Sequence, residues 1–189
     1  MRITGGQFCG RILKVPKSEA IRPTQDRVRE SVFNIIQCEI GGKSFLDLFS
    51  GSGAVGLEAL SRGASSATFV EMNRKHLATL KDNLSALQLQ LNTPTVSAIA
   101  SEVYGWIASY TGPGFDIAFA DPPYALGEEK GYASVLKTLA ERNVVKAGGM
   151  FIAEMTAVQK AEETPGWDLL RDRTYGKTRI CIWRRLESK

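Results

Sequence analysis

Residues 45–56 read FLDLFSGSGAVG, a mostly apolar run that leads into a cluster of glycines. The apolar run predicts a buried strand, and the residues from Ala54 onward predict a helix. Between them, Gly51, Gly53 and Gly56 match the pattern GxGxxG, whose glycines form a tight turn and let a ligand approach the backbone closely. Such a turn between a strand and a helix indicates a site for an adenosine-containing cofactor in an α/β fold.

Two acidic residues near this turn indicate which cofactor it binds. Glu71 lies twenty residues after Gly51, at the end of the next predicted strand, where a carboxylate can hold both hydroxyls of a ribose. Asp47 lies inside the first strand, where it can hold the amino group of a methionine moiety. A dinucleotide site instead places a pyrophosphate at the start of the helix and has little use for a nearby negative charge. Glu71 fits either cofactor, and Asp47 favours S-adenosylmethionine over NAD.

Strands and helices are predicted to alternate along most of the remaining chain, which is typical of a parallel sheet covered by helices on both faces. An N-terminal pair of short strands within residues 2–15 and a C-terminal hairpin flank this pattern. The predicted strands span residues 44–49, 67–71, 95–99, 115–120, 150–154, 167–175 and 177–185, and the predicted helices span 24–41, 54–62, 74–87, 102–110 and 132–142.

The tetrapeptide Asp121-Pro122-Pro123-Tyr124 follows the predicted strand 115–120, at the edge of the sheet where open α/β folds bind ligands. The exocyclic amine of a base is poorly nucleophilic, because its lone pair is delocalised into the ring. The Asp121 carboxylate and the Pro122 carbonyl can accept both N–H groups and stabilise the developing positive charge. The prolines fix the backbone, and Tyr124 offers a flat face for a flipped base. The tetrapeptide predicts amino-methyl transfer to a base.

The composition excludes several other classes of protein. The 189 residues contain no apolar run of about 18 residues that could span a membrane and no apolar segment typical of a secretory signal, so we expect a cytoplasmic protein. The three cysteines lack CxxC spacing, which argues against a zinc site, and their odd number argues against a disulfide framework. The single histidine, His76, makes a His-based catalytic triad improbable.

The net charge of +4 is unevenly distributed. Residues 1–29 hold seven Lys or Arg against two acids, and residues 160–189 hold eight against five, whereas the segment between them is acidic. This asymmetry favours an anionic macromolecule that docks against the terminal segments. A solvated basic face with no partner is the alternative.

These motifs resemble those of class I methyltransferases with a D/N-P-P-Y/F tetrapeptide, and one family is similar over almost the entire chain. It is the RsmD family, bacterial 16S ribosomal RNA guanine 2-amino methyltransferases. The most family-specific match is RPTQDRVRE, residues 22–30. Further matches lie in residues 2–6, 10–16, 33–35, 46–64, 69–71, 121–124 and 175–178.

The resemblance implies a Rossmann-like class I methyltransferase fold of the α/β class. We expect a mostly parallel seven-stranded sheet with helices on both faces, an antiparallel C-terminal hairpin and a small N-terminal β-hairpin. Residues 1–23 would form a basic extension, and residues 24–189 the methyltransferase domain. The implied reaction moves a methyl group from S-adenosylmethionine to the 2-amino group of a guanine in 16S rRNA. The implied substrate is the assembling 30S subunit, and the enzyme would be a monomer that needs no metal.

The candidate site residues fall into three sets. Asp121, Pro122, Pro123 and Tyr124 form the catalytic set. The cofactor-binding set comprises Thr24, Asp47, Phe49, Gly51, Ser52, Gly53, Glu71, Met72, Ser101 and Glu102. The RNA-binding set comprises Arg2, Arg11, Lys14, Arg22, Arg27 and Arg29.

Alternatives stay open for some of these residues. Ser101 or Glu102 could accept from the adenine amino group, although the sequence here departs from the acidic residue typical of the family. Thr24 could contact the cofactor or merely cap a helix. The arginines of residues 22–29 could be exposed residues paired with Asp26 and Glu30.

Three other functions compete with rRNA methylation. A DNA adenine amino-methyltransferase shares the tetrapeptide chemistry, but the chain has no obvious insertion for reading a DNA sequence. A non-catalytic RNA-binding protein could retain the cofactor fold, although the intact tetrapeptide disfavours it. An NAD-dependent oxidoreductase is disfavoured by Asp47.

Overall fold

The computed structural model describes residues 1–16, 23–122, 132–161 and 163–187. The chain divides into two compact units, Met1–Ser101 and Glu102–Lys189. Residues 1–16 pack within the first unit; the predicted boundary at residue 23 follows the undescribed residues 17–22 and stays a prediction.

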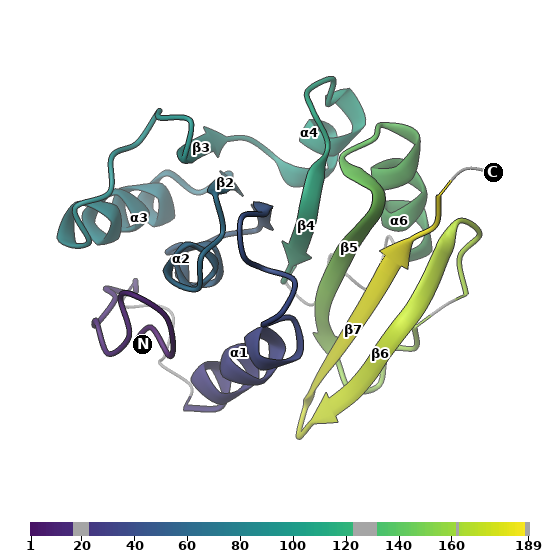
Figure 1. The fold of residues 1–189 in the computed structure, drawn as a ribbon, viewed down its shortest axis with the longest axis horizontal. Helices are drawn as coiled ribbons and strands as arrows, with labels where there is room; N and C mark the ends of the chain where they lie inside the picture. Colours follow the sequence, from purple (N-terminus) through teal and green to yellow (C-terminus); the bar gives the residue numbers. More distant parts are fainter. Residues whose placement is uncertain (17–22, 123–131, 162, 188–189) are drawn as a thin grey trace. The chain divides into compact units, whose positions relative to one another are not determined.

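The first unit is built on three parallel strands in the order β3-β2-β1 (Figure 1). Asp47 in β1 pairs with Phe69 in β2, so that both strands end near the glycine-rich loop. Its elements are α1 (Pro23–Ile35), β1 (Ser44–Leu48), α2 (Ala54–Ser61), β2 (Ser66–Glu71), α3 (Arg74–Ala86) and β3 (Val96–Ala100).

Close packing of α2 and α3 against this sheet explains two glycines of the motif. A Cβ on Gly56 would lie 2.3 Å from the Phe69 ring, and a Cβ on Gly53 would lie 2.3 Å from Leu80. Gly53 also has a φ of 84°, which side chains disfavour. Gly56 therefore lets α2 approach β2, and Gly53 lets the loop pass beside α3.

The N-terminal segment, which we define as residues 1–14, packs on α2 and α3 rather than projecting from the unit. The buried side chains of Ile3 and Leu13 join the apolar cluster that contains Leu57, Leu80 and Leu84. Removal of residues 1–15 would therefore open the core of the first unit. Such a truncation cannot test RNA docking alone.

Two strands were predicted in this segment, and the structure forms one antiparallel bridge, Arg2 to Ile12, instead. The segment does turn back on itself, but Gly6 and Gly10 adopt φ values of 78° and 83°, which interrupt extended backbone. The N–H groups of Ile3, Gly10 and Leu13 bond across the segment, whereas others donate to α2. The Thr4 N–H donates to Glu58, and the Gln7 N–H donates to the Ser61 carbonyl.

Glu58 links the N-terminal segment, α1 and α2 through a buried ionic network. Its carboxylate accepts the backbone N–H and hydroxyl of Thr4 at 2.8 and 2.7 Å, and the guanidinium groups of Arg62 and Arg29 at 2.8 and 3.3 Å. Burial raises the pKa of Glu58, but the hydrogen bonds from Arg62 and Thr4 and the charge of Arg29 outweigh it, so the net pKa is lowered. Glu58 is therefore a satisfied, ionised structural carboxylate.

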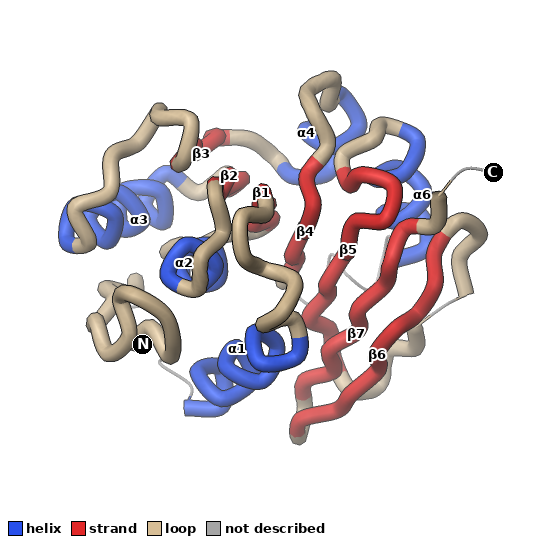
Figure 2. Tube along the Cα trace, viewed as in Figure 1, coloured by secondary structure: helices blue, strands red, loops and turns tan. Residues whose placement is uncertain are grey.

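The second unit contains four strands in the order β4-β5-β7-β6, which Figure 2 shows side by side. β4 and β5 are parallel, whereas β5–β7 and β6–β7 are antiparallel. Its elements are α4 (Val103–Ser109), β4 (Phe115–Ala120), α6 (Tyr132–Glu141), β5 (Val145–Thr156), β6 (Trp167–Tyr175) and β7 (Thr178–Arg185). The strands and helices predicted from residue 44 onward are present, and the closing hairpin is antiparallel as predicted.

Two predicted elements differ in length. The first helix ends at Ile35 rather than at residue 41, because a turn closed by the Glu39 N–H and the Ile36 carbonyl follows it. β5 begins at Val145 rather than Met150. Its extra residues include Gly148 and Gly149, and the register with β4 shifts between Phe115 and Ile117. The glycines and this irregular pairing explain why the sequence pattern did not predict the first part of the strand.

No helix in the described part of the chain is long and apolar enough to cross a membrane. The described residues also contain no cluster of three or more His, Cys, Asp or Glu side chains that could hold a metal.

Candidate active site

The glycine-rich loop that follows β1 turns sharply. Gly51 and Gly53 adopt left-handed φ values of 53° and 84°, and so does the non-glycine Phe49, at 58°. A left-handed φ costs free energy in a residue that has a side chain, and this backbone conformation persists only where the surrounding structure holds it. The strained backbone of Phe49 therefore indicates that the surrounding structure fixes the chain at the end of β1. Such a fixed backbone is expected of a ligand-binding loop.

Glu71 lies at the carboxyl end of β2 and reaches back to this loop. Its carboxylate accepts the Gly51 N–H at 2.9 Å and the Asn73 N–H at 2.7 Å, and Nδ1 of His76 lies 3.7 Å away. Each carboxylate oxygen has two acceptor positions, so both oxygens retain capacity for ribose hydroxyls. The structure thus brings Glu71 and the loop together as the sequence predicted.

Asp47 is buried in β1 and accepts the N–H of Gly56 at 2.8 Å. Burial raises its pKa to about 7; the Gly56 hydrogen bond opposes that rise, and the negative charge of Glu71 adds to it. A buried carboxyl with a second carboxylate nearby favours a cationic partner. The ammonium group of a methionine moiety fits this requirement.

The raised pKa of Asp47 predicts a specific pH dependence of the ligand-free protein. The native state holds the Asp47 proton more tightly than the unfolded state does, so this group stabilises the fold at low pH. That contribution is lost as the pH rises from about 4 to about 7 and amounts to a few kcal/mol. Asp47→Asn keeps an acceptor for Gly56 and should remove this dependence.

Urea unfolding at pH 5 and pH 8 measures the effect as a difference between two proteins. The wild type should lose more free energy of unfolding than Asp47→Asn between these values. An identical loss in both proteins would show that Asp47 does not titrate in this range.

Ser50 is a residue of the glycine-rich loop that the sequence analysis did not select. Its hydroxyl is buried within the first unit and has no hydrogen-bond partner among the described residues. An unsatisfied buried hydroxyl beside Phe49 and Gly51 is a position that a polar ligand group would satisfy. The only sequence signal was its place within the glycine-rich loop.

The other predicted cofactor residues differ in their burial and in the contacts that they make. Ser52 is buried in the loop, and Met72, next to Glu71, is 69% exposed. Ser101 follows β3 and its N–H donates to the Glu71 carbonyl at 3.3 Å. Glu102 caps α4, since its carboxylate accepts the Tyr104 and Gly105 N–H groups. Thr24 lies in α1, and its side chain is outside the described residues.

Asp121 and Pro122 directly follow β4 in the second unit; Pro123 and Tyr124 are outside the described residues. Asp121 is exposed and Pro122 is buried. Burial raises the pKa of Tyr132, and the nearby charge of Asp121 raises it further. The Tyr132 hydroxyl donates to the Glu154 carbonyl at 2.8 Å, and its ring stacks on Trp183, so Asp121 lies near a packed aromatic side chain of this unit.

The predicted RNA-binding residues separate into exposed and buried ones. Arg2, Arg11, Lys14 and Arg27 are exposed, whereas Arg22 lies outside the described residues. Arg29 departs from the prediction, because only 6% of it is exposed and its guanidinium pairs with Glu58 and Asp26. A buried and ion-paired arginine cannot face a phosphate backbone, so Arg29 serves the structure of the first unit.

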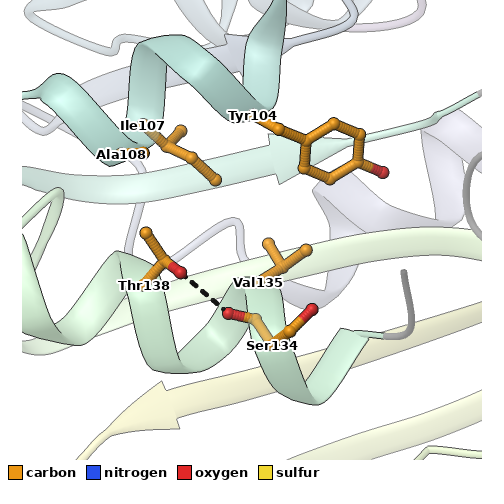
Figure 3. A pocket seen from close by; sticks show the side chains of 6 residues that line it. All are labelled: Tyr104, Ile107, Ala108, Ser134, Val135 and Thr138. Carbon is orange, nitrogen blue, oxygen red and sulfur yellow. Dashed lines mark hydrogen bonds between the residues drawn. The ribbon is translucent and has the colours of Figure 1, made fainter.

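A cavity of about 180 Å³ lies between α4 and α6 in the second unit (Figure 3). It contains none of the predicted site residues and is smaller than typical ligand pockets, which span roughly 300–1,000 Å³. Tyr104, Ile107, Ala108, Ser134, Val135 and Thr138 line it. Among its polar residues, Thr138 bonds within its own helix, to the Ser134 carbonyl.

Comparison with known proteins finds matches over almost the whole chain. The family model described as Conserved hypothetical protein 95 matches residues 1–184. Ribosomal RNA small subunit methyltransferase D of Escherichia coli K12 is 36% identical over 187 residues, which cover 98% of this chain and 90% of that protein.

Solved structures confirm the predicted fold class, a Rossmann-like α/β methyltransferase fold. The structure of yhhF from Escherichia coli matches with a TM-score of 0.85 and 30% identity, over 100% of this chain and 99% of that one. A methyltransferase structure, SMU.776 complexed with SAH, shares the fold with a TM-score of 0.68 and 19% identity, over 87% of this chain and 50% of that one.

Proposed function

The chain belongs to the family described as Conserved hypothetical protein 95, the RsmD family, and from this premise we propose that it methylates ribosomal RNA. The proposed reaction transfers a methyl group from S-adenosylmethionine to the exocyclic 2-amino group of a guanine in 16S rRNA. The substrate would be the assembling 30S subunit, with the enzyme acting as a monomer.

The observation that carries the proposal is the contact between Glu71 and the glycine-rich loop. The carboxylate sits against the Gly51 N–H with acceptor positions left for a ribose. Buried Asp47 beneath the same loop supplies a negative charge for an ammonium group, and the Ser50 hydroxyl supplies a further polar contact. These three groups fit the adenosine and methionine parts of the methyl donor.

When bound, S-adenosylmethionine supplies an electrophilic methyl group on a sulfonium centre. The protein residues must therefore orient the acceptor amine. Asp121 and the Pro122 carbonyl would accept its N–H groups, which directs the nitrogen lone pair toward the methyl group and stabilises the positive charge that develops. Tyr124 would stack on the flipped guanine.

Methylation assays with isotope-labelled donor test the proposal. The protein is incubated with under-methylated 30S particles, free 16S rRNA or DNA, and the labelled nucleoside is identified after digestion. We expect N2-methylguanosine from particles. Labelled methyladenine from DNA would indicate the DNA enzyme instead, and donor binding without transfer to any substrate would indicate a non-catalytic RNA-binding protein.

The exposed basic residues of the N-terminal segment are proposed to dock the RNA. Replacing Arg11 and Lys14 together by glutamate should weaken particle binding and flatten its salt dependence, by about 0.7–0.9 in the log–log slope for each phosphate that is no longer neutralised. Donor affinity should stay nearly unchanged, because both side chains are exposed and Lys14 pairs with Asp82 on the surface.

Filter binding across salt concentrations measures this change. Lys137→Glu is the matched control, since Lys137 is an exposed lysine on α6 in the second unit. If the double variant binds particles with the wild-type affinity and salt slope, the docking surface lies elsewhere.

A further inference from the structure

Asn83 on α3 joins two parts of the first unit that are far apart in sequence. Its side chain is 1% exposed and makes three hydrogen bonds, which use both of its N–H donors and one of its two acceptor positions. Oδ1 accepts the Lys14 N–H at 2.8 Å, and Nδ2 donates to the Lys14 carbonyl and to the Ser52 carbonyl, both at 3.0 Å. One carboxamide thus connects the N-terminal segment to the glycine-rich loop.

On the loop side, this contact fixes one peptide plane. The Ser52 carbonyl faces Asn83, while the N–H of the same peptide, that of Gly53, donates to the Ser50 carbonyl at 2.7 Å. At the other end of the loop, the Gly51 N–H is held by Glu71. Glu71 and Asn83 are thus two of the groups that hold the loop from outside it, and Asn83 is not among the residues predicted to touch a ligand.

The N-terminal segment that Asn83 contacts is itself well anchored in the first unit. Ile3 and Leu13 anchor the N-terminal segment in the core, and Thr4 is bound to buried Glu58. Asn83 bonds to the Lys14 backbone and not to its side chain, which points to Asp82 on the surface. Asn83 therefore couples the position of the N-terminal segment to that of the loop through backbone groups. A substitution that changes only the charge of the Lys14 side chain leaves these backbone groups in place.

We propose that Asn83 is a positioning residue for methyl-donor binding, through which the N-terminal segment holds the glycine-rich loop in its ligand-binding shape. The inference rests on the proposed function, since it assigns the loop to S-adenosylmethionine. Losing the Asn83 amide leaves the buried Ser52 carbonyl unsatisfied and frees the Ser52–Gly53 peptide to rotate.

Calorimetric titration of the full chain with S-adenosylmethionine tests this inference. Asn83→Ala should raise the Kd about tenfold, which matches the loss of a buried hydrogen bond. Asn83→Asp keeps the acceptor for Lys14 but, when ionised, cannot donate to Ser52, so its Kd should rise as much. In methylation assays the KM for the donor should rise with the Kd, while kcat at saturating donor stays within about twofold.

Lys14→Pro tests the same link from the other side. Proline removes the N–H that Asn83 accepts, and we expect the donor Kd to rise about threefold to fivefold. Lys14→Ala keeps this N–H and removes the charge, and its Kd should stay within about twofold of the wild type. Because Lys14→Pro leaves Asn83 intact, it keeps the inference testable if Asn83→Ala does not fold.

Leu139→Ala separates positioning from general destabilisation. Leu139 is a fully buried leucine of α6 in the second unit and does not belong to the apolar cluster that anchors the N-terminal segment, so its truncation should lower the Tm without changing the donor Kd by more than about twofold. Equal Kd values for wild type, Asn83→Ala and Lys14→Pro would overturn the inference and leave the proposed function intact. A wild-type protein that does not bind the donor would overturn the proposed function and the inference with it.

Discussion

Replacing Asp121 by alanine is expected to slow methyl transfer by about a hundredfold to a thousandfold, by analogy with the loss of one preorganised group that stabilises transition-state charge. The carboxylate is proposed to accept a hydrogen bond as the target nitrogen becomes positive. Asp121→Asn keeps an acceptor without the charge and should be impaired less. Single-turnover methylation of 30S particles at saturating donor measures the effect on the chemical step.

Donor affinity and Tm are the controls for this experiment. Asp121 is exposed at the end of β4, so both should change little in either variant. If Asp121→Ala transfers methyl groups as fast as the wild type, the amino-methyl transfer mechanism proposed for this chain is wrong.

The second large effect is expected at Glu71, whose replacement by alanine should weaken donor binding by about 2 kcal/mol or more, roughly thirtyfold in Kd. The variant loses the charged acceptor for the ribose hydroxyls. It also releases the N–H groups of Gly51 and Asn73, which the carboxylate orders. Calorimetric titration with S-adenosylmethionine measures the change.

Asp82→Ala is the matched control for Glu71. It removes a carboxylate from the same unit, but one that lies on the surface of α3 in an exposed ion pair. Its donor Kd should equal that of the wild type. The same Kd in Glu71→Ala would remove Glu71 from the binding site.

The parts of the site that were predicted from the sequence are those encoded locally. The glycine-rich loop follows from a strand, a turn and a helix that are consecutive in the chain, and Glu71 follows from the next strand. Parallel neighbours β1 and β2 end at the same edge, which is why a residue twenty positions later reaches Gly51. Hydrophobic periodicity placed most of the elements for the same reason.

The features that could not be predicted depend on contacts between distant residues. Arg29 looked like a surface arginine because nothing near it in sequence shows that Glu58 would pair with it. Asn83 looked like an ordinary polar residue of an amphipathic helix, since its partners lie 69 and 31 residues away. The N-terminal segment pairs through a single antiparallel bridge rather than two strands, and its contacts with α2 are likewise between residues far apart in sequence.

The packing of the N-terminal segment also affects the order in which parts of the chain fold. Ile3 and Leu13 are buried by Leu57, Leu80 and Leu84, which are synthesised long after them. Ile3 and Leu13 therefore have no apolar partners until α2 and α3 have been made. Contacts of such long sequence separation form slowly, because a large loop must close before they stabilise anything. Docking of residues 1–14 is thus a late step in the folding of the first unit, and a growing chain exposes these two core side chains until that step occurs.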